Sequence, residues 1–397
     1  MGRTAEPDTP RTENHSSRHR ANGLHVGFIL LAGLLARIPF YLAFRPVWSG
    51  DSPGYSLFYY LWRHHVFYLG ERTPVYPLFL GAAQWLAGGP PEPFLSQRAA
   101  YAAILMQSAL DVLAAVLFYF TLRALRIRGS IALGASIFLA TIPAVCGYEM
   151  NILNMSLAFF SLVLVISFFV STVQRLRTGK DIGIAARATG TALAVAVLNR
   201  PDLLIFAVLL LLITACLSLK PRLPGSVSKF SAGPLGAAAW MALPLVSGLF
   251  VWMLLMGFEG HAADGIKFVR NGSTFVRNNS IAAITNAAAN AESPLLTLMY
   301  VVTLGYVIFF FLRAILSGER GDHWLTDVTV ATLAVASVGT IVGTCVLAGL
   351  NRVYSLPHLV VFTICTAYAL ENLSRIVSVF RRARSLRTPV SANVGTV

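Results

Sequence analysis

The chain has 397 residues, of which 56% are hydrophobic and only 12% are charged, and its mean hydropathy is +0.67. An ordinary soluble domain carries roughly a quarter charged residues, so this composition excludes a soluble protein and indicates one that crosses a membrane several times. The formal net charge of +14 does not indicate a nucleic-acid partner, because the basic residues cluster in alternate connections between apolar runs, as the positive-inside rule predicts.

About ten apolar runs approach the roughly 20 residues that are needed to cross a hydrocarbon core of about 30 Å. They lie at residues 25–44, 101–122, 130–146, 153–173, 183–199, 202–219, 236–256, 295–315, 328–349 and 357–378. With both termini cytoplasmic, an even number of spans puts the large basic clusters on the inner side. The sequence therefore predicts an all-α polytopic protein of the plasma (inner) membrane, a bundle of about ten transmembrane helices with interfacial helices in its first outer loop.

The polar ends and long connections predict the domain organisation. Residues 1–22 are expected to form a disordered cytoplasmic tail, residues 23–380 a single transmembrane domain, and residues 381–397 a basic cytoplasmic tail. Two connections are long enough to fold outside the membrane, at residues 45–100 and 257–294. The second contains the repeat FVRNGS and FVRNNS, and a loop of this length is either functional or merely solvated.

The first candidate catalytic residue, Asp51, follows the first span in the stretch WSGDSPGY. A carboxylate at the membrane boundary beside a Gly-Ser-Pro turn is partly desolvated, which suits it to take a proton from an attacking hydroxyl or amine. The alternative is that Asp51 only begins a turn or caps the helix that follows. That helix has Tyr55, Phe58 and Trp62 at helical spacing, as expected of a helix in the headgroup region.

The same loop continues with GERTPVYPLFLG, in which Glu71 is a candidate second acid and Arg72 a candidate outward cation. Pro74 and Pro77 stiffen this entry and would hold both residues near the membrane surface. A Pro-rich turn into a membrane-embedded helix fits the spacing equally well. The run VYPLFLGAAQWLAGG is too short to span and is predicted to be half-embedded or re-entrant.

Two ionisable residues lie within predicted spans, Arg37 in the first and Asp111 in the second. An unpaired charge at the bilayer centre costs a few kcal/mol, so the two are expected to form an ion pair with each other. A structural pair is the preferred interpretation, and a proton or substrate role is the alternative. Apart from these and Glu371 the spans lack acids, which argues against an ion-coupled transporter.

Further candidates lie at the outer ends of later spans: Glu149 in CGYEMN, Arg200 in LNRPDLL and Arg352 in NRVYSLP. A guanidinium group is permanently charged and can bind two phosphate oxygens at once, so these arginines suit a phosphate ligand, although interfacial snorkelling is the alternative for each.

Motifs of soluble enzymes, such as a Gly-rich phosphate loop, HExxH, paired CxxC or GxSxG, are absent from the sequence. The four cysteines lie in or at the ends of spans without metal-ligand or disulfide spacing, so they are expected to be small packing residues.

Together, SGDSPGY, RTPVYPLFLG, GYEMN, NRPDLL and NRVYSLP occur in an order that resembles the GT-C superfamily of integral-membrane glycosyltransferases, including the protein O-mannosyltransferase and lipid A aminoarabinose transferase groups. The resemblance implies that Asp51 is the catalytic base, that Glu149 lies near the active site, and that Arg200 and Arg352 bind the lipid phosphate. The chain departs from these groups at Ser52, where a second acid is common. It also lacks an Asp-x-Asp motif, so no metal or other cofactor is implied.

The resemblance implies an inverting transferase on the extracytoplasmic face. Its partners would be a polyprenyl-phosphate-linked sugar donor, membrane lipids, and an acceptor that is a glycan, a lipid or a protein. The alternatives are a transporter or flippase of lipid-linked glycans, or a polysaccharide polymerase or ligase.

Overall fold

The computed structural model describes residues 15–48, 52–66, 73–89, 92–216, 233–258, 305, 324–348 and 356–387. Apart from one isolated parallel bridge between Val47 and Asn151, the regular structure in these ranges is helical. The helices are α1 (His15–Ala43), α2 (Ser52–Arg63), α3 (Val75–Leu86), α4 (Gln97–Ala124), α5 (Gly129–Thr141), α6 (Pro143–Glu149), α7 (Met155–Thr178), α8 (Gly183–Asn199), α9 (Leu203–Cys216), α10 (Pro234–Phe258), α14 (Trp324–Ala348), the 3-10 helix η3 (Leu356–His358) and α16 (Leu359–Arg387).

The helix lengths confirm an all-α polytopic membrane protein. In the described part of the chain, five helices are long and apolar enough to cross a membrane, and α5 with α6, bent by 42° at their junction, forms a sixth candidate. Helices α8, α9 and the apolar part of α16 are shorter. The predicted span at 295–315 lies almost wholly outside the described residues. The number of ten spans therefore remains a prediction.

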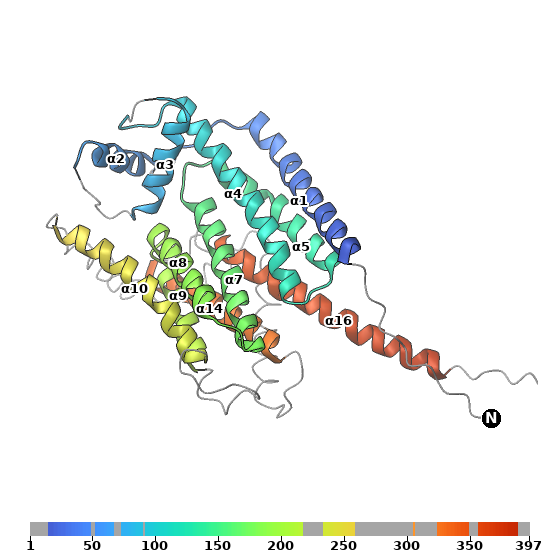
Figure 1. Ribbon diagram of the computed structural model, residues 1–397. Helices are drawn as coiled ribbons and strands as arrows, with labels where there is room; N and C mark the ends of the chain where they lie inside the picture. The colour runs from blue at the N-terminus through green and yellow to red at the C-terminus, as the bar shows by residue number, and fades with distance from the viewer. Residues whose placement is uncertain are drawn as a thin grey trace, which may run out of the picture.

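Helix α4 lies at the centre of one half of the bundle, where it packs against α1, α5 and α7, and it also contacts α3 (Figure 1). On the other side, α7 contacts α8, and α8 packs closely against α10. The main hydrophobic core joins these helices through side chains such as Phe118, Leu162 and Phe206. Many other large apolar side chains are exposed, for example Leu34 and Phe250, as expected of helices that face lipid.

The N-terminal end of α1 differs from the expectation of a disordered tail over residues 1–22, because α1 begins at His15. A specific contact holds this end against α4. The Tyr119 hydroxyl donates to Asn22 Oδ1 at 2.9 Å, and it also lies 2.8 Å from His25 Nδ1. The polar segment before the predicted span is therefore helical, and its contact with Tyr119 of α4 could not be predicted from composition.

The two short helices α2 and α3 lie together at one end of the bundle (Figure 1). Helix α3 has 12 residues, which span about 18 Å at 1.5 Å per residue, so the prediction that it is too short to cross the membrane is confirmed. Its embedding in the membrane remains a prediction. A second, smaller core joins α2, α3 and α4 through Tyr55, Tyr76 and Ala103.

The opposite end of the bundle carries the basic clusters that end α4 and α7, and we call it the basic end. Here the carboxylate of Glu371 in α16 accepts a hydrogen bond from the backbone N–H of Arg128 at 3.0 Å. Its other carboxylate oxygen lies 3.3 Å from Arg128 Nε. A carboxylate at the N-terminus of α5 is favoured by the helix dipole, so this contact joins α16 to α5.

The cysteine prediction is confirmed at Cys146 and Cys365, which are buried. Cys216 differs, because it is exposed at the end of α9. The three thiols are free, and Cys345 lies outside the described side chains.

The contact between α8 and α10 depends on a glycine. A Cβ built at Gly190 would lie 2.1 Å from the Met241 carbonyl oxygen, which is backbone and cannot rotate away. Gly134, in the middle of α5, is a suitable control position for Gly190, because a Cβ built at Gly134 would have no atom within 4 Å. Small residues in membrane helices commonly permit such close backbone approach.

We therefore expect Gly190→Ala to lower the free energy of unfolding by about 1–3 kcal/mol, because the two helices must separate to admit the methyl group. Gly134→Ala should leave stability unchanged or slightly raised. Unfolding of the two variants by SDS in mixed micelles provides the measurement. Equal stability of both variants would contradict the tight contact.

Candidate functional site

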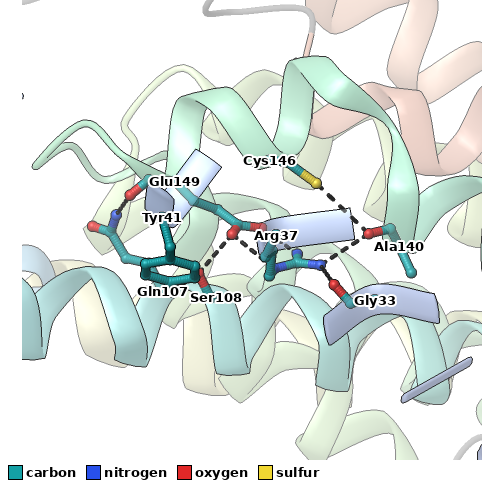
Figure 2. Close-up of polar contacts among 8 residues, drawn as sticks. All are labelled: Gly33, Arg37, Tyr41, Gln107, Ser108, Ala140, Cys146 and Glu149. Carbon is teal, nitrogen blue, oxygen red and sulfur yellow. Dashed lines mark hydrogen bonds and ion pairs between the residues drawn. The ribbon is translucent and has the colours of Figure 1, made fainter. Parts of the chain in front are cut away.

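A buried polar cluster lies where α1, α4 and α6 meet (Figure 2). Arg37 of α1 is only 2% exposed, and its Nε donates to Glu149 Oε2 at 2.8 Å, while its Nη2 pairs with Glu149 Oε1. Its Nη1 donates to the carbonyl oxygens of Gly33 at 2.8 Å and Ala140 at 2.9 Å. Four of the five guanidinium N–H groups thus have partners, and these partners lie on three helices.

The acid of this pair is not the predicted one. Glu149 is fully buried and also accepts a hydrogen bond from Ser108 Oγ at 2.6 Å, and Tyr41 donates to the same hydroxyl at 2.8 Å. The expectation that Arg37 pairs with Asp111 was therefore wrong. The physical reason is the 42° bend between α5 and α6, which brings the last residue of α6 onto α1 and α4.

Asp111 is nevertheless buried, as predicted, with 2% of its surface exposed. It lies beside this ion pair, with the Glu149 carboxyl group and the Ser156 hydroxyl as neighbours. Neither of its carboxylate oxygens has a described partner in good hydrogen-bond geometry. The cluster therefore holds two carboxyl groups and one guanidinium group at membrane depth.

Gln107 connects the buried cluster to the end of the bundle where α2 and α3 lie. Its Nε2 donates to the carbonyl oxygens of Glu149 at 2.7 Å and Asn151 at 3.0 Å, and its Oε1 accepts from Tyr76 Oη of α3 at 2.8 Å. Gln107 and Tyr76 are both fully buried. The turn between α6 and α7 is thereby fixed against α3 and α4.

The turn between α6 and α7 also binds the segments on both sides of Asp51. The Val47 backbone N–H donates to Met150 O at 2.8 Å, and the Ile152 N–H donates to Val47 O at 3.0 Å. On the far side of Asp51, Ser52 Oγ donates to Ile152 O at 2.7 Å. Asp51 itself lies outside the described residues, but the chain on both sides of it is attached to the same turn.

The turn between α8 and α9 contacts the segment before α3 and the start of α7 through Asn199. The Asn199 carbonyl accepts from Thr73 Oγ1 at 3.0 Å and from Asn154 Nδ2 at 2.9 Å, while Asn199 Nδ2 donates to Asn154 O at 3.1 Å. Thr73 directly follows Glu71 and Arg72, which lie outside the described residues. The described segments next to Asp51, Arg72 and Arg200 therefore meet at one end of the bundle. We call this end the site end.

Arg200, the other described candidate, follows Asn199 and is 4% exposed. Its Nε and Nη2 donate to the two carboxylate oxygens of Asp202, each at 3.0 Å, and its Nη1 contacts the sulfur of Met155. The guanidinium group is thus already engaged with one carboxylate. His358 of η3, fully buried, is a further neighbour of Asp202, and its Nδ1 lies 3.1 Å from Ser337 Oγ.

The structure thus describes two of the six predicted site residues, Glu149 and Arg200. The turn before α7 and the first residue of α7 connect them, because Gln107 donates to both Glu149 O and Asn151 O, and Met155 contacts Arg200. Arg352, like Asp51, Glu71 and Arg72, lies outside the described residues. Among the residues that the structure does describe, no three of His, Cys, Asp or Glu gather as a metal site would require. The absence of a metal remains a prediction.

Sequence reasoning missed Gln107, Ser108 and the Asn154–Asn199 pair. A signal was present for the first two, since they lie within one turn of Asp111 in an otherwise apolar helix. Polar side chains on one face of a membrane helix indicate partners inside the bundle. The two asparagines gave no such signal, because they stand in connections where Asn is common.

The fold and the site end together define a multi-pass helical membrane protein with a polar site built where several spans end. No family model matches the chain, and no curated protein matches it in sequence. Solved structures do match in fold. The chain is similar to the Archaeoglobus fulgidus oligosaccharyltransferase AglB in complex with an inhibitory peptide and a dolichol-phosphate, with a TM-score of 0.55 and 13% identity over 95% of this chain and 52% of that one.

The apo form of the A. fulgidus oligosaccharyltransferase matches with a TM-score of 0.53 and 12% identity over 93% of this chain and 53% of that one. A third match is the Saccharomyces cerevisiae protein O-mannosyltransferase Pmt1–Pmt2 complex bound to the sugar donor, with a TM-score of 0.46 and 15% identity over 61% of this chain and 34% of that one. The chain spans about half the length of the oligosaccharyltransferase and a third of the mannosyltransferase chain. The expected fold is confirmed, because the chain shares the fold of the A. fulgidus oligosaccharyltransferase.

Proposed function

We propose that this protein is a membrane glycosyltransferase that transfers a sugar from a polyprenyl-phosphate donor to an acceptor on the extracytoplasmic side. The observation that carries the proposal is the convergence at the site end. The chain on both sides of Asp51 is bound to the turn between α6 and α7, and Thr73, next to Arg72, is bound to Asn199, next to Arg200. The described segments next to Asp51, Arg72 and Arg200 thereby meet at one end of the bundle, which supports the proposal.

This set of groups matches what the reaction needs. A sugar on a lipid phosphate already carries its leaving group, so the protein has to deprotonate the acceptor, align it and stabilise the departing phosphate. In the proposed step, Asp51 takes the proton of the acceptor hydroxyl or amine. That oxygen or nitrogen bonds to the anomeric carbon, and the bond to the phosphate oxygen breaks with inversion. Arg72, Arg200 and Arg352 are the candidate groups for the phosphate, and Glu71 is a candidate second acid.

The fold comparison supports the lipid-linked donor. The A. fulgidus oligosaccharyltransferase has been solved with a dolichol-phosphate, and its fold extends over 95% of this chain. We propose a donor of the same chemical kind here. The test is to incubate the purified protein with polyprenyl-phosphate sugars and membrane extracts, and to measure release of free polyprenyl phosphate. No release with pentose, hexose or amino-sugar donors would contradict the proposal.

The burial of Glu149 favours an indirect role. Its carboxylate is engaged by Arg37 and Ser108, while its backbone carbonyl accepts from Gln107. We propose that Glu149 positions the turn that holds Asp51 rather than contacting the sugar.

The role proposed for Arg200 gives a separate prediction. Arg200→Ala should weaken donor binding about 10-fold or more, because a hydrogen bond to a charged group contributes about 1.5–3 kcal/mol. The same change leaves Asp202 without its partner and destabilises the fold. The control is therefore the double variant Arg200→Ala with Asp202→Asn, which removes the unpaired charge.

The double variant should recover stability but not affinity for the donor. Donor affinity is measured by microscale thermophoresis with a fluorescent polyprenyl-phosphate sugar in detergent. If the double variant binds the donor as tightly as the unchanged protein does, Arg200 serves only to pair with Asp202.

A further inference from the structure

Asp111 of α4 is a buried acid to which the proposed function assigns no role. It lies near the middle of this 28-residue helix, about 20 Å from either end at 1.5 Å per residue. The side chain is 2% exposed, and neither carboxylate oxygen accepts a hydrogen bond of good geometry from a described donor. Buried polar groups nearly always have a hydrogen-bond partner, so the charge state of this carboxyl group needs a physical explanation.

The position of Asp111 on α4 places it beside Glu149. Gln107 and Ser108 lie four and three residues before Asp111, so the three side chains share one face of the helix. Both of these residues bind Glu149: Ser108 Oγ donates to Oε2 at 2.6 Å, and Gln107 Nε2 donates to the backbone carbonyl at 2.7 Å. Asp111 continues this row, and its polar neighbours are the Glu149 carboxyl group and the Ser156 hydroxyl.

The buried polar cluster has one described cation for two carboxyl groups. That cation is Arg37, whose Nε and Nη2 both pair with the Glu149 carboxylate, while its Nη1 donates to two backbone carbonyls. An ionised Asp111 would therefore add an anion that has no paired cation among the described residues. Two carboxylates in one buried site repel each other, and such pairs keep one proton. Since Glu149 holds the arginine, Asp111 is the group that keeps the proton.

The other titratable groups of the cluster, Tyr41 and Cys146, do not change this balance. The Tyr41 hydroxyl donates to Ser108 Oγ at 2.8 Å, and the Cys146 thiol donates to the Ala140 carbonyl oxygen at 3.8 Å. A hydroxyl or thiol that donates its hydrogen is neutral, so neither group supplies a positive charge.

The hydrogen-bonding capacity of Glu149 leaves room for a donor. An ionised carboxyl group only accepts, so two carboxylates cannot hydrogen-bond to each other, whereas a protonated one has an O–H to donate. A carboxylate has about four acceptor sites. Arg37 and Ser108 occupy three of those on Glu149. The fourth is available to an O–H group of the neighbouring Asp111.

We propose that Asp111 keeps its proton in the folded protein and donates a hydrogen bond to the Glu149 carboxylate. The cluster then contains one cation, one anion and one neutral acid. The Asp111 hydroxyl adds a donor from α4 that helps to fix the last residue of α6. This inference does not rest on the proposed function, because it concerns the charge state of the cluster and not the transfer of a sugar.

Infrared spectroscopy of the full-length protein at neutral pH tests the proposal, since exposed carboxyl groups are then ionised. The protein is measured in dodecyl maltoside, a detergent without a carbonyl group. A protonated carboxyl group has a carbonyl stretch at a higher frequency than carboxylates and amides, and the band shifts in D₂O. The unchanged protein should show such a band, and Asp111→Asn should lose it. Aspartate labelled with carbon-13 in its side-chain carboxyl group should lower the frequency of the band, and labelled glutamate should not.

Glu371→Gln is the matched control, because it removes another buried carboxylate that pairs with an arginine. This variant should keep the band. Absence of the band from the unchanged protein, its persistence in Asp111→Asn or its loss in Glu371→Gln would overturn the proposal. If Asp111→Asn does not fold, isotope labelling of the unchanged protein decides. A band that shifts with labelled glutamate and not with labelled aspartate would overturn the assignment to Asp111.

Discussion

Replacement of Asp51 by Asn is expected to lower the rate of sugar transfer by about 10²- to 10⁴-fold, the range that general base catalysis contributes. The amide has nearly the same shape as the carboxylate, so expression and donor binding should remain. The contacts that flank Asp51 involve the backbone of Val47 and the hydroxyl of Ser52, and neither depends on the Asp51 side chain. The measurement is the release of polyprenyl phosphate in membranes that contain equal amounts of each variant.

Glu71→Gln is the matched comparison, because it removes the other candidate acid of the same outer loop. If Asp51 is the base, Glu71→Gln should reduce the rate less than Asp51→Asn does. Transfer at more than a tenth of the unchanged rate in Asp51→Asn would remove the chemical basis of the proposed mechanism. Such tolerance combined with donor binding would instead favour a flippase of lipid-linked glycans, which needs no base.

The second large effect is expected from Arg37→Met, which should lower the free energy of unfolding by about 3–5 kcal/mol. The substitution leaves the Glu149 carboxylate buried without the guanidinium group, although it keeps the hydrogen bond from Ser108. The cost comes mostly from this unpaired charge and not from the loss of an attraction. Unfolding by SDS in mixed micelles measures the change.

The double variant Arg37→Met with Glu149→Gln is the control, since it removes both charges and keeps similar volumes. It should recover most of the loss, because replacing a buried ion pair with neutral groups is often close to neutral. If the double variant is as unstable as Arg37→Met, the packing of the arginine stem and not the charge accounts for the effect. Ser108→Ala removes two hydrogen bonds, the one donated to Glu149 and the one accepted from Tyr41, and should cost about 2 kcal/mol.

Several features of the fold were predictable because they depend on local composition. Apolar runs of sufficient length became helices α1, α4, α7, α10 and α14, since a backbone in hydrocarbon has to satisfy its own hydrogen bonds. The shortness of α3 followed in the same way from the length of its run. The burial of Arg37 and Asp111 followed from their depth within these runs.

The sequence also named candidate residues for the site. The motifs and their order indicated six candidates: Asp51, Glu71, Arg72, Glu149, Arg200 and Arg352. The described segments next to Asp51, Arg72 and Arg200 meet at the site end. The catalytic roles of these residues remain predictions. The partner of Arg200 was adjacent in sequence, yet its engagement with Asp202 was not foreseen, because a turn can direct two neighbouring side chains together or apart.

The sequence by itself determined which segments form long apolar helices and which charged residues lie within them, because hydrophobicity depends on composition along the chain. Only the tertiary structure decided which buried groups meet. Arg37 pairs with Glu149 because α6 bends away from α5 and returns its last residue to the bundle. The partner of a buried charge depends on the rotation, axial offset and bending of helices, and these are fixed by packing between segments distant in sequence.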